Sequence, residues 1–194
     1  MNDLVLRRHS GGIPSDLARA VARLHVAAID RGFLSSLGEP FLASLYEGLA
    51  SSRSAFVITA TYAGDLLGFI CGATSTRSAY LDFMLSRRSP AAALRLLPRL
   101  MSLATARRVA ETLLYPARQA EVPLPPAEIL NFCVSEARRG QGVGRRLFEA
   151  LSAEFDRRSV REIRIVTGVD QRSAQDFYRS EERRVGKECL RLCR

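Results

Sequence analysis

The sequence has no tryptophan, and it has only two histidines, His9 and His25. Both lie apart from the four cysteines, and no Cys-x-x-Cys pair occurs. A structural zinc site needs about four such ligands at close spacing, so no metal site is expected. Cys71 and Cys133 lie in apolar, strand-like runs, which predicts small buried thiols. Unpaired thiols of this kind fit a reducing cytoplasm best.

Long hydrophobic runs are also missing. No stretch approaches the roughly 20 apolar residues that cross a bilayer, and residues 1–10 lack the apolar core of a signal peptide. We therefore expect a cytoplasmic protein without a membrane span. With 194 residues, 47% of them hydrophobic, the chain is long enough for one domain with a buried core.

Negative charge is in short supply, because the net charge is +9. Residues 179–194 hold six basic and three acidic residues, a net +3, so +6 is distributed over the rest of the chain. No basic stripe interleaved with aromatic residues occurs, and no nucleic-acid motif. A nucleic-acid partner is therefore not expected, whereas a polyanionic small ligand would suit the charge.

The hydrophobic pattern alternates between strand and helix periods. Predicted strands are residues 4–7, 55–62, 66–73, 128–134 and 163–166. Predicted helices are residues 16–28, 41–49, 143–155 and a last one that begins with 173–178. The tight turn at Ala63, Gly64 and Asp65 joins the second and third strands into a hairpin.

Residues 77–120 differ from this pattern, because arginines are mixed with leucines and alanines and Pro90 and Pro98 interrupt them. We interpret this stretch as a helical insertion of two or three helices. Its charges indicate a solvated face; a cap over the substrate or a homodimer surface is the alternative.

The most informative segment is a Gly-rich turn, Arg139-Gly-Gln-Gly-Val-Gly144-Arg145, between an apolar strand and an amphipathic helix. The start of a helix leaves backbone N–H groups without partners, and its dipole favours negative charge. Glycines allow a phosphate to approach the backbone, and the two arginines add positive charge. The turn therefore predicts a phosphate site; a connector without a ligand is the alternative.

Two common phosphate loops do not fit the turn. A Walker loop needs Gly-Lys followed by Ser or Thr, which is absent. The dinucleotide fingerprint needs a third glycine where Arg145 stands. What remains is Arg-x-x-Gly-x-Gly over residues 139–144, which resembles the acetyl-CoA signature, Gln/Arg-x-x-Gly-x-Gly/Ala, of the GNAT family of N-acetyltransferases.

The resemblance extends from about residue 4 to residue 178 and is weakest over residues 77–120. Residues 171–178, Gln-Arg-Ser-Ala-Gln-Asp-Phe-Tyr, resemble the family's Asn-x-x-Ala-x-x-Phe-Tyr helix. It implies one α/β (α+β) domain over residues 1–178, with a mixed, mostly antiparallel central sheet flanked by helices. It also implies that acetyl-CoA is the co-substrate and that an amine on a small molecule or a peptide is the acceptor.

The resemblance further implies which residues bind acetyl-CoA. In the family the fourth strand carries a bulge and parts from the fifth, so that its backbone pairs with the pantetheine arm. The residues that the resemblance assigns to acetyl-CoA binding come from the fourth strand, from the Gly-rich turn and from one amide side chain. They are Phe132, Cys133, Val134, Arg139, Gly140, Gln141, Gly142, Val143, Gly144, Arg145 and Gln171.

Two catalytic residues are expected. Tyr178 matches the family tyrosine that protonates the leaving thiolate; the alternative is a tyrosine that only packs against Phe177. Many relatives carry a glutamate base on the fifth strand, but by spacing Val166 stands there. Glu128 is the candidate in its place, against the alternative of a solvated carboxylate at the strand end. A chain of waters or an amine that is already neutral would also serve.

Residues 179–194 depart from the family pattern. The family continues with a turn, Gly-Phe and two closing strands, whereas this stretch is basic and shows no alternating apolar pattern. We expect the resemblance to stop near residue 179 and the tail to be foreign to the fold, which would leave one sheet edge unpaired.

The sequence favours an N-acetyltransferase that acts on a small amine, an amino sugar or a protein N-terminus. A regulatory domain that binds acyl-CoA without turnover is the alternative, and a basic nucleic-acid-binding module is a third reading.

Overall fold

A computed structural model describes residues 3–29, 33–86, 124–168, 171–185 and 189–193. Within them the chain forms one six-stranded sheet in the order β1-β2-β3-β4-β5-β6. The first four strands pair antiparallel, whereas β4 with β5 and β5 with β6 are parallel. This confirms the predicted mixed, mostly antiparallel sheet flanked by helices. The strands are β1 Val5–His9, β2 Ala55–Tyr62, β3 Asp65–Ala73, β4 Glu128–Val134, β5 Ile163–Thr167 and β6 Cys189–Cys193.

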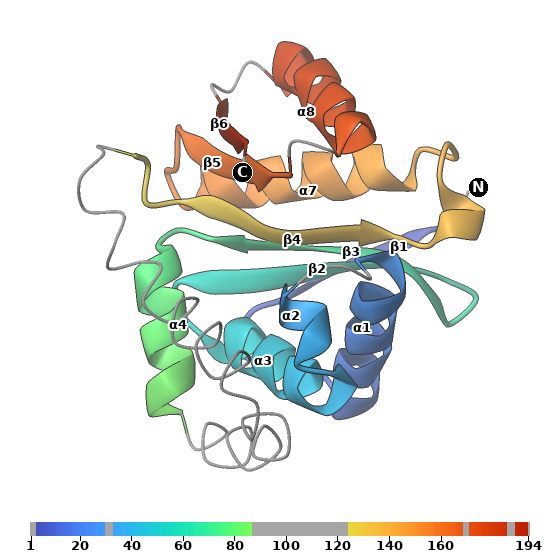
Figure 1. Ribbon diagram of the computed structural model, residues 1–194, viewed down its shortest axis with the longest axis vertical. Helices are drawn as coiled ribbons and strands as arrows, with labels where there is room; N and C mark the ends of the chain where they lie inside the picture. The colour runs from blue at the N-terminus through green and yellow to red at the C-terminus, as the bar shows by residue number, and fades with distance from the viewer. Residues whose placement is uncertain (1–2, 30–32, 87–123, 169–170, 186–188, 194) are drawn as a thin grey trace.

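Helices cover both faces of the sheet (Figure 1). One layer holds the four helices α1 Ser15–Ala28, α2 Phe33–Ser36, α3 Glu39–Ser51 and α4 Thr76–Leu85. The other layer holds α7 Val143–Arg157 and α8 Arg172–Val185. Each layer packs on its own set of apolar side chains, so the sheet separates two hydrophobic cores.

The hairpin of β2 and β3 forms as its sequence predicts. Ala63 and Gly64 both have positive φ, at 50° and 90°. That pair of conformations defines a type I′ turn, whose twist matches that of the two strands. Most residues of both strands are buried, and the hairpin lies between β1 and β4 in the sheet.

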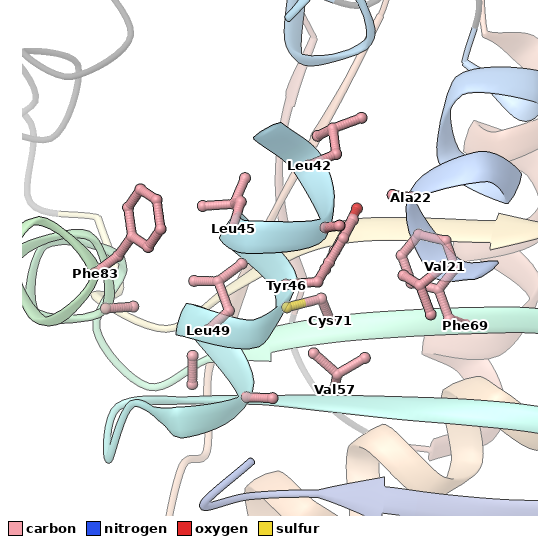
Figure 2. Packing of buried hydrophobic residues seen from close by; sticks show 14 of the residues in the cluster. Val21, Ala22, Leu42, Leu45, Tyr46, Leu49, Val57, Phe69, Cys71 and Phe83 are labelled. Carbon is pink, nitrogen blue, oxygen red and sulfur yellow. The ribbon is translucent and has the colours of Figure 1, made fainter. Parts of the chain in front are cut away.

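The core beneath α1 and α3 contains one polar pair. Tyr46 of α3 lies beside Cys71 with its hydroxyl directed away from Val57 (Figure 2), and this hydroxyl lies 2.5 Å from His25 Nδ1 of α1. Both side chains are buried. Burial lowers the pKa of His25 to about 4, so the imidazole is neutral at physiological pH.

Two stretches depart from the sequence predictions. Helix α4 accounts for the start of the predicted insertion at residues 77–120, and the remainder of that prediction lies outside the described residues. After Tyr178, helix α8 continues to Val185, and β6 then pairs with β5 along five residues. The predicted unpaired edge at β5 is therefore wrong, because backbone pairing needs no alternating apolar side chains.

Candidate functional site

Strands β4 and β5 touch only at one end. Their parallel register consists of two pairs, Glu128 with Arg164 and Ile129 with Ile165. On its other side β4 stays paired with β3 as far as Val134, and Leu130 is an extra residue there, because Cys71 faces Asn131 while Gly72 faces Ile129. This bulge lies where the two parallel strands part. We call the part of β4 that has no partner on β5, residues 130–134, the fork.

The ladder with β3 decides which backbone groups of the fork point away from β3. The N–H of Ser135 donates to Leu67 O at 2.8 Å, which makes these two residues a hydrogen-bonded pair. Such pairs alternate along an antiparallel ladder, so Cys133 also bonds to β3, whereas Phe132 and Val134 turn their N–H and C=O groups to the other side. In the register of the described residues, no β5 residue meets those groups.

Cys133 contributes no reactive thiol to the fork. Its side chain lies in the core beneath α1 and α3 and is 4% exposed. Burial raises the pKa of the thiol to about 12, although the charge of Arg139 opposes the shift. Its backbone is the part of the predicted site that pairs with β3, so Phe132 and Val134 are better placed for a ligand.

The Gly-rich turn follows β4 through a short 3₁₀ helix, Glu136–Arg138. Gly140 and Gly142 adopt left-handed conformations, with φ of 74° and 81°. A Cβ at either position would meet nothing within 4 Å, so both glycines face open space. The side chain of Gln141 donates back to Ala137 O at 3.0 Å, which stiffens the turn. The glycines therefore serve the backbone conformation and leave the space in front of it clear.

Helix α7 begins directly behind this space. Gly142 is its N-cap and supplies no side-chain cap, and the first helical bond runs from Arg146 N to Gly142 O at 3.1 Å. The N–H groups of Val143, Gly144 and Arg145 precede that bond and have no intrahelical acceptor. No acidic residue occupies the first turn of the helix. This arrangement is suited to binding an anion such as a pyrophosphate.

The remaining residues of the turn divide between packing and charge. Val143 is buried in the core beneath α7, and a Cβ at Gly144 would lie 3.3 Å from the ring of Phe132, so this glycine lets the helix approach β4. Arg139 is exposed. Arg145 is half-exposed, with its Nε 3.5 Å from the buried carboxylate of Glu181.

Gln171 lies in the turn between β5 and α8. Its side-chain oxygen accepts from Gly168 N at 3.3 Å, and its own N–H donates to Gly168 O at 3.1 Å. The residue is exposed. The structure thus gives Gln171 a role in shaping the turn, and the predicted contact with the cofactor arm stays a prediction.

Tyr178 lies in an aromatic cluster beside the fork. Its ring centroid is 6.2 Å from that of Phe132, 6.1 Å from that of Phe148 and 5.6 Å from that of Phe177. The residue is 6% exposed. The packing against Phe177 that the sequence offered as an alternative is therefore present, and Phe132 brings the tyrosine next to the fork.

Glu128 lies at the closed end of the fork and is not the solvated carboxylate that the sequence allowed. It is 6% exposed. Its Oε2 accepts hydrogen bonds from the guanidinium of Arg164 and from Thr76 Oγ1, the latter at 2.7 Å. Because Oε2 already accepts bonds from two buried side chains, this environment favours a structural role over the predicted role of base.

Sequence reasoning missed Arg164 and Thr76. Arg164 stands between two buried isoleucines of β5, where an apolar residue is the usual choice, and it is itself 5% exposed. A lone arginine in a buried strand was the available signal, because a buried charge requires a partner. The partner lies far away in the sequence, and only the fold reveals it.

The described residues contain neither a candidate metal site nor a candidate membrane span. No group of three or more His, Cys, Asp or Glu residues there is placed to hold a metal ion. In the same part of the chain, no helix has the length and apolar character needed to cross a membrane.

Comparison with known proteins gives one family match. Residues 98–181 match the acetyltransferase (GNAT) family, a range that includes part of the stretch predicted as an insertion. No curated protein matches the sequence significantly.

Solved structures share the fold at low sequence identity. AAC(6')-Iy in complex with the bisubstrate analog CoA-S-monomethyl-acetylneamine has a TM-score of 0.58 and 11% identity, over 95% of this chain and 90% of that chain. An aminoglycoside acetyltransferase, meta-AAC0020 from an uncultured soil metagenomic sample, has a TM-score of 0.57 and 16% identity, over 92% and 87%. The ribosomal-protein-alanine N-acetyltransferase from Brucella melitensis biovar Abortus 2308 has a TM-score of 0.50 and 15% identity, over 91% and 89%.

At these identities the structural likeness establishes the fold alone. Residues 98–181 match the acetyltransferase (GNAT) family, and the chain shares the fold of solved acetyltransferases.

Proposed function

We propose that the chain transfers an acetyl group from acetyl-CoA to the primary amine of an acceptor. The acceptor classes are a small amine, an amino sugar or a protein N-terminus. The observation that carries the proposal is the fork of β4 lying beside an uncapped helix start with two open glycines. The structural neighbours include acetyltransferases named for an aminoglycoside and for a ribosomal-protein alanine, which supports an amine acceptor.

The residues present fit acetyl-CoA in two places. The free N–H groups at the start of α7, with Arg139 and Arg145 beside them, suit the pyrophosphate. The outward N–H and C=O groups of Phe132 and Val134 suit the amide groups of the pantetheine arm, in the manner of an added strand. Gln171 is the proposed amide contact further along the arm.

The chemistry requires one bond to form and one to break. The amine nitrogen attacks the carbonyl carbon of the thioester, the C–S bond breaks, and the sulfur leaves as a thiolate that takes up a proton. Backbone N–H groups of the fork would stabilise the developing oxyanion. We assign the proton donor to Tyr178, whose ring packs on Phe132 at the fork. The amine attacks in its neutral form, its nitrogen then loses one proton to water, and Tyr178 regains the proton it donated from water.

Calorimetric titration with acetyl-CoA tests the proposal. Arg139→Glu should raise the dissociation constant at least about tenfold, because each exposed charge contact contributes roughly 1 kcal/mol and the reversal counts twice. Arg161→Glu is the matched control, since Arg161 is exposed and lies outside the turn. Equal affinity of the two variants would show that the turn is only a connector.

Turnover distinguishes the proposed enzyme from the alternative, a regulatory domain that binds acyl-CoA. Release of the CoA thiol would be followed with a panel that contains an aminoglycoside, a polyamine and a peptide with N-terminal alanine. Release that depends on one of these amines supports the enzyme. Tight binding of acetyl-CoA without release supports the regulatory domain. We place the reaction in the cytoplasm, in keeping with the free, buried thiols of Cys71 and Cys133.

A further inference from the structure

The closed end of the fork contains a buried ion pair. Glu128 and Arg164 face each other as the first of the two residue pairs that join β4 to β5. Their side chains are 8% and 6% exposed, and the Arg164 guanidinium donates to Glu128 Oε2. A buried pair of charges therefore lies one residue before the point at which the two strands begin to part.

Further bonds tie three elements to this point. Thr76, the first residue of α4, donates from its hydroxyl to Glu128 Oε2 at 2.7 Å. Its backbone N–H donates to Pro126 O at 3.3 Å. The backbone N–H of Arg164 donates to Ala127 O at 2.8 Å. Helix α4, strand β4 and strand β5 are thus joined within a few residues of one carboxylate.

Stability alone does not explain such a pair. Removing two charges from water costs free energy that their attraction repays only in part, and well-packed apolar residues often replace a buried pair without loss. A charged pair does, however, favour one register of the strands over its neighbours, because a shift by one residue would bury both charges without a partner. Beyond the pair, the register of β4 with β5 contains one more residue pair, Ile129 with Ile165.

We propose that Glu128, Arg164 and Thr76 form a clamp that sets the register of β4 against β5 and so the opening of the fork. This inference rests on the proposed function. The clamp makes Glu128 and Arg164 positioning residues for acetyl-CoA, because they act through the strands and touch neither the amine nor the thioester. This role differs from that of a base, which would act on the acceptor and leave the binding of acetyl-CoA unchanged.

Four variants test the clamp. Glu128→Gln and Arg164→Met each break the pair and leave the other charge buried without its charged partner. The double variant removes both charges. Glu154→Gln is the matched control, because Glu154 is a carboxylate 2% exposed that pairs with Arg8 and Arg158 at the far end of α7 from the Gly-rich turn. Urea denaturation of all four variants shows that each is folded and how much stability it has lost.

Titration with acetyl-CoA provides the first readout. Glu128→Gln and Arg164→Met should each raise the dissociation constant by about tenfold or more, which corresponds to a loss of about 1.4 kcal/mol of binding free energy. The double variant should recover part of that loss. Glu154→Gln should stay within about twofold of the parent, as distant sites usually do. Unchanged affinity in both single variants would overturn the clamp, and a loss of turnover alone in Glu128→Gln would indicate a base instead.

Amide hydrogen exchange provides a readout that needs no ligand. The N–H groups of Arg164 and Ile165 should exchange faster in Glu128→Gln than in Glu154→Gln, once the exchange rates are corrected for each variant's loss of global stability. If the parent fails to bind acetyl-CoA, the proposed function falls, while the exchange rates still decide the clamp. Equal exchange in the two variants would overturn it.

Discussion

Tyr178 combines a packing role with a proposed chemical one. Its ring belongs to an aromatic cluster with Phe132, Phe148 and Phe177, and this packing would survive loss of the hydroxyl. Tyr178→Phe should therefore lower kcat by about a hundredfold, the lower bound for a positioned proton donor. The dissociation constant of acetyl-CoA should stay unchanged. Steady-state kinetics with the best amine of the panel, together with calorimetry, measure these quantities.

A second buried tyrosine provides the control. Tyr46 lies on the opposite face of the sheet, and Tyr46→Phe removes a hydroxyl without touching the fork. This variant should keep kcat and lose some stability, because His25 loses its hydrogen-bond partner. If Tyr178→Phe turns over as fast as the parent, Tyr178 is a packing residue and another group protonates the sulfur.

At the scale of elements, the start of α7 depends on one backbone conformation. Gly142 has φ 81° and ψ −1° as the N-cap, a region that a side chain with Cβ enters at a cost of roughly 1–2 kcal/mol. Gly142→Ala should lower the free energy of unfolding by about that amount and weaken acetyl-CoA binding. Gly142→Asn should cost less, because asparagine tolerates this region. Urea denaturation of both variants would show the difference, and equal stability of alanine and glycine would contradict the assigned conformation.

The packing of α1 on α3 should make the fold sensitive to acid. The pKa of His25 is lowered to about 4 by burial, so the folded chain resists a proton that the unfolded chain accepts near pH 6.5. The stabilising contribution is complete above pH 6.5 and is lost as the pH falls towards 4. The free energy of unfolding should fall by at most about 1.4 kcal/mol per pH unit in this window. Urea denaturation between pH 7 and pH 5 measures the slope.

His25→Asn removes the titration and should flatten that slope. His9 adds a smaller effect of the same sign, because burial and the charge of Arg7 lower its pKa. Burial raises the pKa of both Cys71 and Cys133, so these thiols stay neutral throughout the window. An equal slope in the parent and in His25→Asn would assign the acid sensitivity to other groups.

Local patterns predicted the elements that depend on neighbouring residues. The hairpin at Ala63 and Gly64, the strand before the Gly-rich turn and the amphipathic α7 all formed where the sequence placed them. Contacts between distant segments were not predictable in this way. The clamp pairs residues of two strands, and β6 joins the sheet through backbone groups, which leave no pattern in the sequence.

The candidate site shows the same division. The glycine pattern located the turn, and the resemblance to the GNAT family implied the parting of the fourth and fifth strands. The sequence did not separate Cys133, whose backbone pairs with β3, from Phe132 and Val134, because that distinction depends on the ladder with β3. It also left Glu128 as a candidate base, since the arginine that holds it is visible only after folding.

At the scale of the whole molecule, the tail beyond Tyr178 decides how the sheet ends. Strand β6 pairs with β5 from Cys189 to Cys193 and occupies its outer edge (Figure 1). Removing residues 186–194 would expose the N–H and C=O groups of β5, and a bare strand edge pairs readily with other chains. The shortened chain should therefore self-associate at concentrations at which the full chain does not, as measured by light scattering.

Removing residues 186–194 should change the melting temperature only slightly, although it should promote self-association. Each ladder bond contributes about 1 kcal/mol net, but ordering each residue costs roughly 1–2 kcal/mol, so a short added strand gains little stability. Leu190→Pro isolates the backbone effect, because proline cannot donate to the ladder with Arg164 and its neighbours; Leu190→Ala is its control. If the shortened chain and Leu190→Pro both remain monomeric, β6 does not protect the edge, and the tail is as foreign to the fold as its sequence after Tyr178 predicts.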